Sequence, residues 1–170
     1  MVKNLLASLL FWAAFSLAYP AGFQFGYLEN IQVADGIRQY SSQAFNRNPS
    51  DVLGYPGIVM AQVILRVGLL VLLALTFWLL ARRKGANSFT VLAGFVACFL
   101  FIRFAFFSFA LNWVGGLIKM PFARIADSFY YFTLTGCTFV LLSLLVGFGA
   151  IRLAGRRHTA KSPVGSPQSA

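Results

Sequence analysis

The stretch GIVMAQVILRVGLLVLLALTFWLLA, residues 57–81, decides the fold class of this chain. It is apolar throughout except for Gln62, Thr76 and one charged side chain, Arg66. A helix needs about 20 apolar residues to cross the roughly 30 Å of hydrocarbon in a bilayer. The stretch therefore predicts a membrane-spanning helix, and it raises the question of why an arginine lies in its middle.

Three further stretches have similar length and character, near residues 5–23, 89–111 and 129–153. Of the 170 residues in the chain, 59% are hydrophobic and 11% are charged, and the mean hydropathy is +0.75. Soluble domains are roughly a quarter charged. We therefore predict an all-α integral membrane protein, an antiparallel four-helix transmembrane bundle formed by residues 1–157. The four stretches use most of the chain, which leaves no room for a separate soluble domain.

The first of these stretches begins like a secretory signal, with Lys3 ahead of a short apolar run. No clean A-x-A cleavage site follows, and the apolar character continues to Phe23 and Phe25. We favour an uncleaved first helix. The alternative is a mature protein with three spans.

The distribution of basic residues predicts the orientation of the bundle. Of the fourteen Lys and Arg, eight lie at the amino terminus, in the second loop or in the tail, four lie in the first and third loops, and two lie within spans. Cytoplasmic loops are enriched in Lys and Arg, so we expect both termini in the cytoplasm of a cell with a bacterial-type inner membrane. The net charge of +10 then reflects topology and contact with the lipid bilayer, and no nucleic-acid partner is expected.

The loops and the tail differ in composition. The first outer loop, residues 24–55, has apolar residues at three- and four-residue steps, which favours a short amphipathic helix on the outer membrane surface or capping the bundle. A plain structured loop is the alternative. Asp127 or Ser128 is expected to cap the last span. The tail, residues 158–170, is rich in Ser, Pro and Gly without an apolar pattern, and we expect it to be disordered.

Two arginines within spans are the candidate binding residues. Arg66 lies ten residues after Pro56 and Arg103 lies ten residues before Trp113. Each is therefore about 15 Å from the outer end of its helix. Charged side chains at such a depth are costly and normally face protein or water. The carboxylates of Asp127, Glu29 or Asp51 would have to fold inward to reach these arginines. The candidate polar neighbours within the bundle are backbone carbonyl groups and the side chains of Gln62, Ser108, Asn112, Thr133 and Thr135.

Three interpretations of the arginines are open at this point. In the first, the side chains snorkel along their aliphatic stems or hydrogen-bond to neighbouring helices, which is a structural role. In the second, they pair with acidic residues of a partner subunit. In the third, two guanidinium groups at one depth bind a phosphate, a carboxylate or a small anion from the outer side.

Missing residue types argue against several chemistries. His158 is the only histidine and lies in the tail, so we expect no haem or metal site built on histidine within the membrane. Cys98 and Cys137 form no C-x-x-C pair and are expected to be buried as small apolar residues. No G-x-S-x-G sequence, Gly-rich phosphate loop or pair of carboxylates is present. We therefore expect no catalytic residues, no cofactor and no metal.

Two pairs of small residues, Gly22 with Gly26 and Ser143 with Gly147, have the spacing that lets helices approach closely, although chance supplies one or two such pairs in a bundle.

With catalytic groups missing, the preferred hypothesis is a non-enzymatic accessory, assembly or inhibitory subunit of a larger membrane complex, a class that includes immunity proteins. The alternative is a small transporter or channel for an anion or a lipid headgroup. It would be oligomeric, because four spans rarely enclose a pathway.

Overall fold

The computed structural model describes residues 2–39, 55–103 and 114–155, and within them all regular structure is helical. Three helices are long and apolar enough to cross a membrane, and a fourth apolar helix is shorter. They are α1 (Val2–Gly26), α3 (Tyr55–Arg83), α6 (Ser128–Gly155) and the shorter α4 (Phe89–Arg103). The long apolar helices identify the chain as a membrane-embedded protein.

The predicted spans 5–23, 57–81 and 129–153 lie inside α1, α3 and α6, and α4 begins at Phe89, where the third predicted span begins. The described part of α4 has 15 residues. At 1.5 Å per residue it is about 22 Å long, which is less than the hydrocarbon thickness. The rest of that predicted span, residues 104–111, and the predicted tail, residues 158–170, lie outside the described residues.

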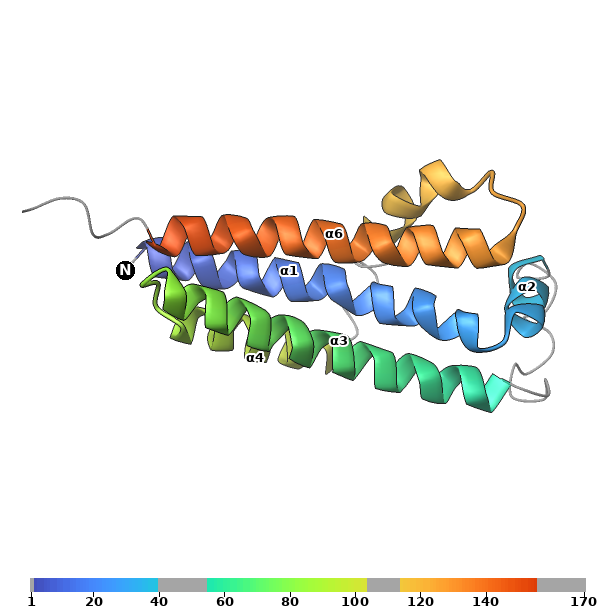
Figure 1. Ribbon diagram of the computed structural model, residues 1–170, viewed down its shortest axis with the longest axis horizontal. Helices are drawn as coiled ribbons and strands as arrows, with labels where there is room; N and C mark the ends of the chain where they lie inside the picture. Colours follow the sequence, from blue (N-terminus) through green and yellow to red (C-terminus); the bar gives the residue numbers. More distant parts are fainter. Residues whose placement is uncertain (1, 40–54, 104–113, 156–170) are drawn as a thin grey trace, which may run out of the picture.

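Helix α1 lies at the centre of the molecule. It contacts α6, α3 and α4 along its length, whereas these three helices have few contacts with one another. Figure 1 shows that α1 and α4 run in one direction and that α3 and α6 run in the other. The start of α1 and the end of α6 therefore lie at the same end of the bundle.

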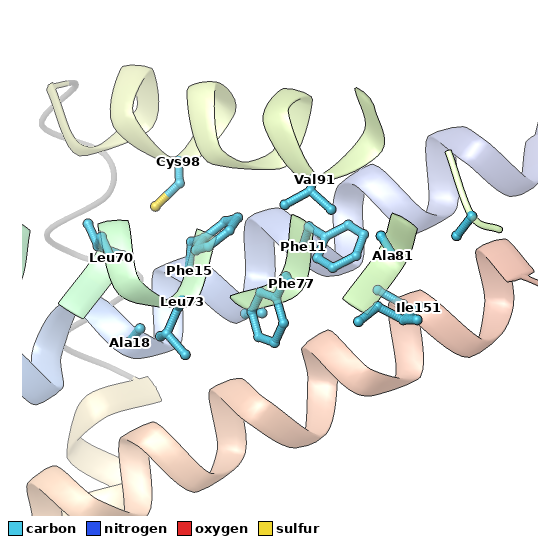
Figure 2. Packing of buried hydrophobic residues seen from close by; sticks show 13 residues of the cluster. Phe11, Phe15, Ala18, Leu70, Leu73, Phe77, Ala81, Val91, Cys98 and Ile151 are labelled. Atoms are coloured by element: carbon cyan, nitrogen blue, oxygen red, sulfur yellow. The ribbon is translucent and has the colours of Figure 1, made fainter. Parts of the chain in front are cut away.

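The core between these helices is built from aromatic rings. Phe11 and Phe15 of α1 lie against Phe77 of α3, with ring centroids 5.7 and 5.8 Å apart, and all three side chains are fully buried. Figure 2 shows this cluster closed by Cys98 from α4 and by Ile151 from α6. Burying each such side chain contributes about 1.5–3 kcal/mol when water is the reference solvent. In a bilayer the lipid tails are as apolar as these side chains, so the stabilisation comes from close packing between the helices.

Polar residues fix the helix ends outside the apolar runs. The carboxylate of Asp127 accepts a hydrogen bond from the Tyr130 N–H at 3.1 Å, so Asp127 caps α6 as the sequence predicted. At the end of α3, Gly85 has a φ of 63°, a conformation that favours glycine. The Gly85 N–H donates to the Arg82 carbonyl and the Ala86 N–H to the Ala81 carbonyl, which satisfies the last turn of α3.

The segment that follows α1 crosses the far end of the bundle. A 3-10 turn, η1 (Tyr27–Glu29), leads into α2 (Ile31–Gln39), which Figure 1 shows at the end where α3 and α6 begin. Ala34 of α2 is fully buried. A helix is therefore present within the first predicted loop, residues 24–55. Residues 40–54 of the same loop lie outside the described residues.

A further short helix, residues 114–119, is followed by the 3-10 turn η4 (Met120–Phe122). A Cβ atom on Gly115 would lie 3.8 Å from the Phe139 ring, so this segment lies against α6. It leads the chain to the start of α6.

Candidate functional site

Arg66 lies where α3 crosses the last part of α1, and two glycines make this crossing close. A Cβ atom on Gly22 would lie 2.6 Å from the backbone nitrogen of Arg66, and one on Gly26 would lie 2.2 Å from Cγ of Gln62. Both distances are shorter than any contact that a real Cβ atom makes. The Gly22 and Gly26 pair therefore lies at a helix interface, and its spacing matches that of Gln62 and Arg66 on α3.

The guanidinium of Arg66 is held by groups within the bundle. Its Nε donates a hydrogen bond to the Gln62 carbonyl at 2.9 Å, and its Nη1 donates to the Tyr19 hydroxyl of α1 at 2.8 Å. The Cζ atom of Arg66 also lies 5.2 Å from the centroid of the Tyr19 ring and 4.9 Å from that of Phe23. Cation–π contacts of this kind contribute about 0.5–2 kcal/mol, and more where water is excluded. Arg66 is therefore half-buried against α1.

Two buried glutamines lie on the two helices of this crossing. Gln62 is 4% exposed and its Nε2 lies 3.5 Å from the Phe23 carbonyl, while Gln24 is 2% exposed. The Thr135 hydroxyl of α6 lies 3.2 Å from Gln24 Oε1. The half of the bundle where α1 ends thus contains polar groups from α1, α3 and α6, whereas the other half has the phenylalanine core.

Each polar group of this site is neutral except Arg66. Among the residues that the structure describes, Arg66 forms no ion pair. Its contacts are the ones that a structural role predicts, because a neighbouring helix supplies the acceptor. Its positive charge is nevertheless not compensated by a carboxylate from the described residues.

Of the predicted site residues other than Arg66 and Gln62, only Asp127 has a described side chain. Asp127 caps α6 and forms no ion pair with Arg66. Arg103 ends the described part of α4, and its side chain lies outside the described residues, as does Asn112. Thr133 is described, and its hydroxyl is buried without a hydrogen-bond partner in the described part of the chain. The pairing of Arg66 and Arg103 at one depth stays a prediction.

The sequence did not indicate Tyr19 and Phe23 as partners of Arg66. Tyr19 lies in the apolar run of the first span and is also a residue type typical of a membrane interface. The available signal was the matched four-residue spacing of Gly22 and Gly26 on one span and of Gln62 and Arg66 on the next. Packing these pairs against each other would have placed Arg66 next to α1.

A second polar cluster attaches α2 to the start of α6. The Ser128 hydroxyl donates to Asp35 Oδ1 at 2.6 Å. Arg38, one helical turn after Asp35, donates from Nη1 to the Ala126 carbonyl at 3.3 Å and from Nη2 to the Ile125 carbonyl. The Cζ atom of Arg38 lies 4.1 Å from the centroid of the Tyr131 ring. These contacts fix the end of the bundle.

The two cysteines differ from the expectation that both are buried. Cys98 is 1% exposed and lies in the core, with the Ser16 hydroxyl 3.8 Å from its Sγ. Cys137 is exposed, which corrects the prediction, because Gly136 and Phe139 occupy the buried face of this part of α6. Within the described ranges, no three His, Cys, Asp or Glu side chains come together as a metal site would require.

Comparisons of the chain with known protein families, with curated proteins and with solved structures gave no significant match.

Proposed function

We propose that this chain is a non-enzymatic membrane protein that binds a larger membrane protein within the bilayer, as an accessory, assembly or inhibitory subunit. The observation that carries the proposal is the state of Arg66. It is a permanently charged group, held in place by Tyr19 and Gln62, and it has no carboxylate partner in the described part of the chain.

The hydrogen-bond capacity of Arg66 supports a partner. A guanidinium has five N–H donors in a planar fork. Described residues accept from two of them, one on Nε and one on Nη1. The remaining donors, including both on Nη2, match the two oxygens of a carboxylate. The same contact would neutralise the charge of an acidic side chain in a partner's span. Each protein would therefore supply the counter-charge that the other lacks.

We further propose four spans with both termini in the cytoplasm and with α2 as an amphipathic helix on the outer side. The alternating directions of α1, α3, α4 and α6 support this arrangement. The positions of the basic residues also support it, because Arg82 and Arg83 lie in the last turn of α3 and Arg152 lies in the last turn of α6. Arg82 lies over the Trp78 ring at 4.5 Å, a contact suited to a membrane interface. A bacterial-type inner membrane is the membrane that this charge pattern favours.

The alternative function is a small oligomeric transporter or channel for an anion or a lipid headgroup. A pathway through one copy is disfavoured, since α1 occupies the centre and its Phe11 and Phe15 rings are fully buried there. Transport would need a pathway between copies. The two functions therefore predict different complexes, a stoichiometric larger protein in the first and a self-assembled oligomer in the second.

Extraction of the tagged protein in a mild detergent, followed by mass analysis of the proteins that co-purify, tests the proposal. We expect a larger membrane protein at a fixed ratio. Arg66→Met should strip it from the complex, because the partner's carboxylate would then be buried without its counter-charge, which typically costs about 3–5 kcal/mol. Recovery of an oligomer of this chain alone would favour the transporter.

Arg82→Met is the matched control, since it removes an arginine from the same helix at the membrane interface. It should leave the larger protein bound. Arg66→Lys is a third variant, which keeps the charge but loses the planar fork, and it should weaken retention less than Arg66→Met does. Equal retention of a partner by all three variants would contradict the role of Arg66.

A further inference from the structure

A cleft opens between α3 and α6 at the end of the bundle where both helices finish. Its volume is about 420 Å³. It is lined by Leu80, Lys84, Phe148, Ile151, Arg152 and Gly155. It exists because α3 and α6 both pack on α1 and have few contacts with each other.

The cleft has an apolar base and a basic rim. Ile151 is 5% exposed and forms the base, and a Cβ atom on Gly155 would lie 3.3 Å from the Lys84 carbonyl, so the two helix ends are close there. Phe148 of α6 is 45% exposed and forms a wall that continues onto the lipid-facing surface. Lys84 and Arg152 are both exposed at the rim.

The charges at this end of the molecule are all of one sign in the described residues. The three described acidic residues, Glu29, Asp35 and Asp127, belong to η1, to α2 and to the start of α6, at the opposite end (Figure 1). Neither Lys84 nor Arg152 forms an ion pair with a described residue. The last carbonyl groups of α3 accept hydrogen bonds from the turn at Gly85, which reduces the negative charge that a helix end would otherwise present.

We propose that this cleft binds one anionic phospholipid, with its phosphodiester between Lys84 and Arg152 and the start of an acyl chain over Leu80 and Phe148. An ammonium and a guanidinium together suit a phosphate, the first as a point charge and the second through paired N–H donors. A basic side chain near an anionic membrane surface raises affinity about fivefold. A zwitterionic lipid, whose headgroup has no net charge, gains much less.

The experiment uses the full chain, purified in a mild detergent and titrated with phosphatidylglycerol or phosphatidylcholine, with bound lipid counted by native mass spectrometry. We expect the wild type to retain one phosphatidylglycerol in preference to phosphatidylcholine. Lys84→Gln combined with Arg152→Gln should weaken binding of phosphatidylglycerol about 25-fold, about fivefold for each charge. Lys84→Arg combined with Arg152→Lys keeps both charges and should retain most of the affinity.

The control variant, Lys3→Gln combined with Arg83→Gln, removes the same charge from the same end of the bundle without changing the cleft lining. It should bind phosphatidylglycerol nearly as well as the wild type does. An equal loss in the control and the cleft variant would overturn the site in favour of diffuse attraction. Displacement of the lipid by inorganic phosphate would show a site for the free anion and would also overturn the proposal. Circular dichroism of each variant verifies that the helices are intact.

Discussion

Replacing Gly22 by alanine is the sharpest test of how the site is built. The new Cβ atom would lie 2.6 Å from the nitrogen and 2.7 Å from the Cα of Arg66, both backbone atoms that cannot rotate away. Ordinary carbon contacts begin near 3.5 Å, so α1 and α3 must separate by roughly 1 Å. Overpacking of this kind costs about 1–3 kcal/mol. Weakening the hydrogen bond between Arg66 and Tyr19 adds about 0.5–1.5 kcal/mol.

We therefore expect Gly22→Ala to lower the free energy of unfolding by about 2–4 kcal/mol. Gly68→Ala is the matched control, because a Cβ atom on Gly68 meets no atom within 4 Å. In that variant the higher helix propensity of alanine should raise stability by up to about 1 kcal/mol. The two identical substitutions, on two packed helices, should thus change stability in opposite directions.

The assay is equilibrium unfolding in mild-detergent micelles titrated with a denaturing detergent, followed by tryptophan fluorescence. Trp12 reports on the bundle because its ring lies edge-on to Phe101, with centroids 5.3 Å apart. If Gly22→Ala and Gly68→Ala unfold at the same detergent concentration, the close crossing of α1 and α3 is refuted.

Three further variants test individual contacts. Tyr19→Phe should destabilise the bundle by about 1 kcal/mol, and a double-mutant cycle with Arg66→Met should give a coupling of similar size; additive effects would contradict the hydrogen bond. Ser128→Ala should speed amide hydrogen exchange in α2 while leaving α1 unchanged, because it removes a contact with Asp35; unchanged exchange in α2 would count against that attachment. Burial lowers the pKa of Lys119, so the wild type should become more stable as the pH rises from this lowered pKa toward the ordinary value of about 10.4. Lys119→Met has no titrating group at this position, so it should lack that rise in stability when the unfolding titration is repeated across this pH range.

The positions of the helices could be predicted from the sequence because bilayer thickness sets the length of an apolar run. The 57–81 stretch lies inside α3 for this reason, and α4 begins at Phe89, just after the basic loop. The cap at Asp127 was predictable from local chemistry as well, since a short carboxylate before an apolar run accepts a backbone N–H.

The central position of α1 could not be predicted from hydrophobic periodicity. Each long helix is apolar on all sides, so no stripe indicates which face is buried. The deciding feature is the size of the side chains, because small residues allow other helices to approach. Helix α1 has four alanines, in separate turns, that are fully buried: Ala7, Ala14, Ala18 and Ala21. The predicted span 5–23 also contains more alanines than any of the other three predicted spans.

The partner of Arg66 was equally hard to predict, because Tyr19 belongs to an apolar run and its hydroxyl becomes an acceptor only when α1 and α3 pack in one register. That register is set by Gly22 and Gly26, which lie opposite Arg66 and Gln62. The sequence contains both pairs, but their relation is visible only once two spans are placed side by side.

The same register links the stability of the bundle to its proposed function. Arg66 is held at three points, by the Gln62 carbonyl, by the Tyr19 hydroxyl and by the two aromatic rings of α1. A side chain fixed in this way has already lost its rotamer freedom on folding. A partner's carboxylate therefore binds Arg66 without the entropy cost of ordering the arginine side chain, which raises the affinity. Tyr19→Phe should therefore weaken partner retention more than its small effect on stability implies, since it removes one of the contacts that fix the guanidinium without removing the charge. Arg82 on the same helix has the Trp78 ring as its only side-chain contact among the described residues, and replacing Trp78 should leave partner retention unchanged.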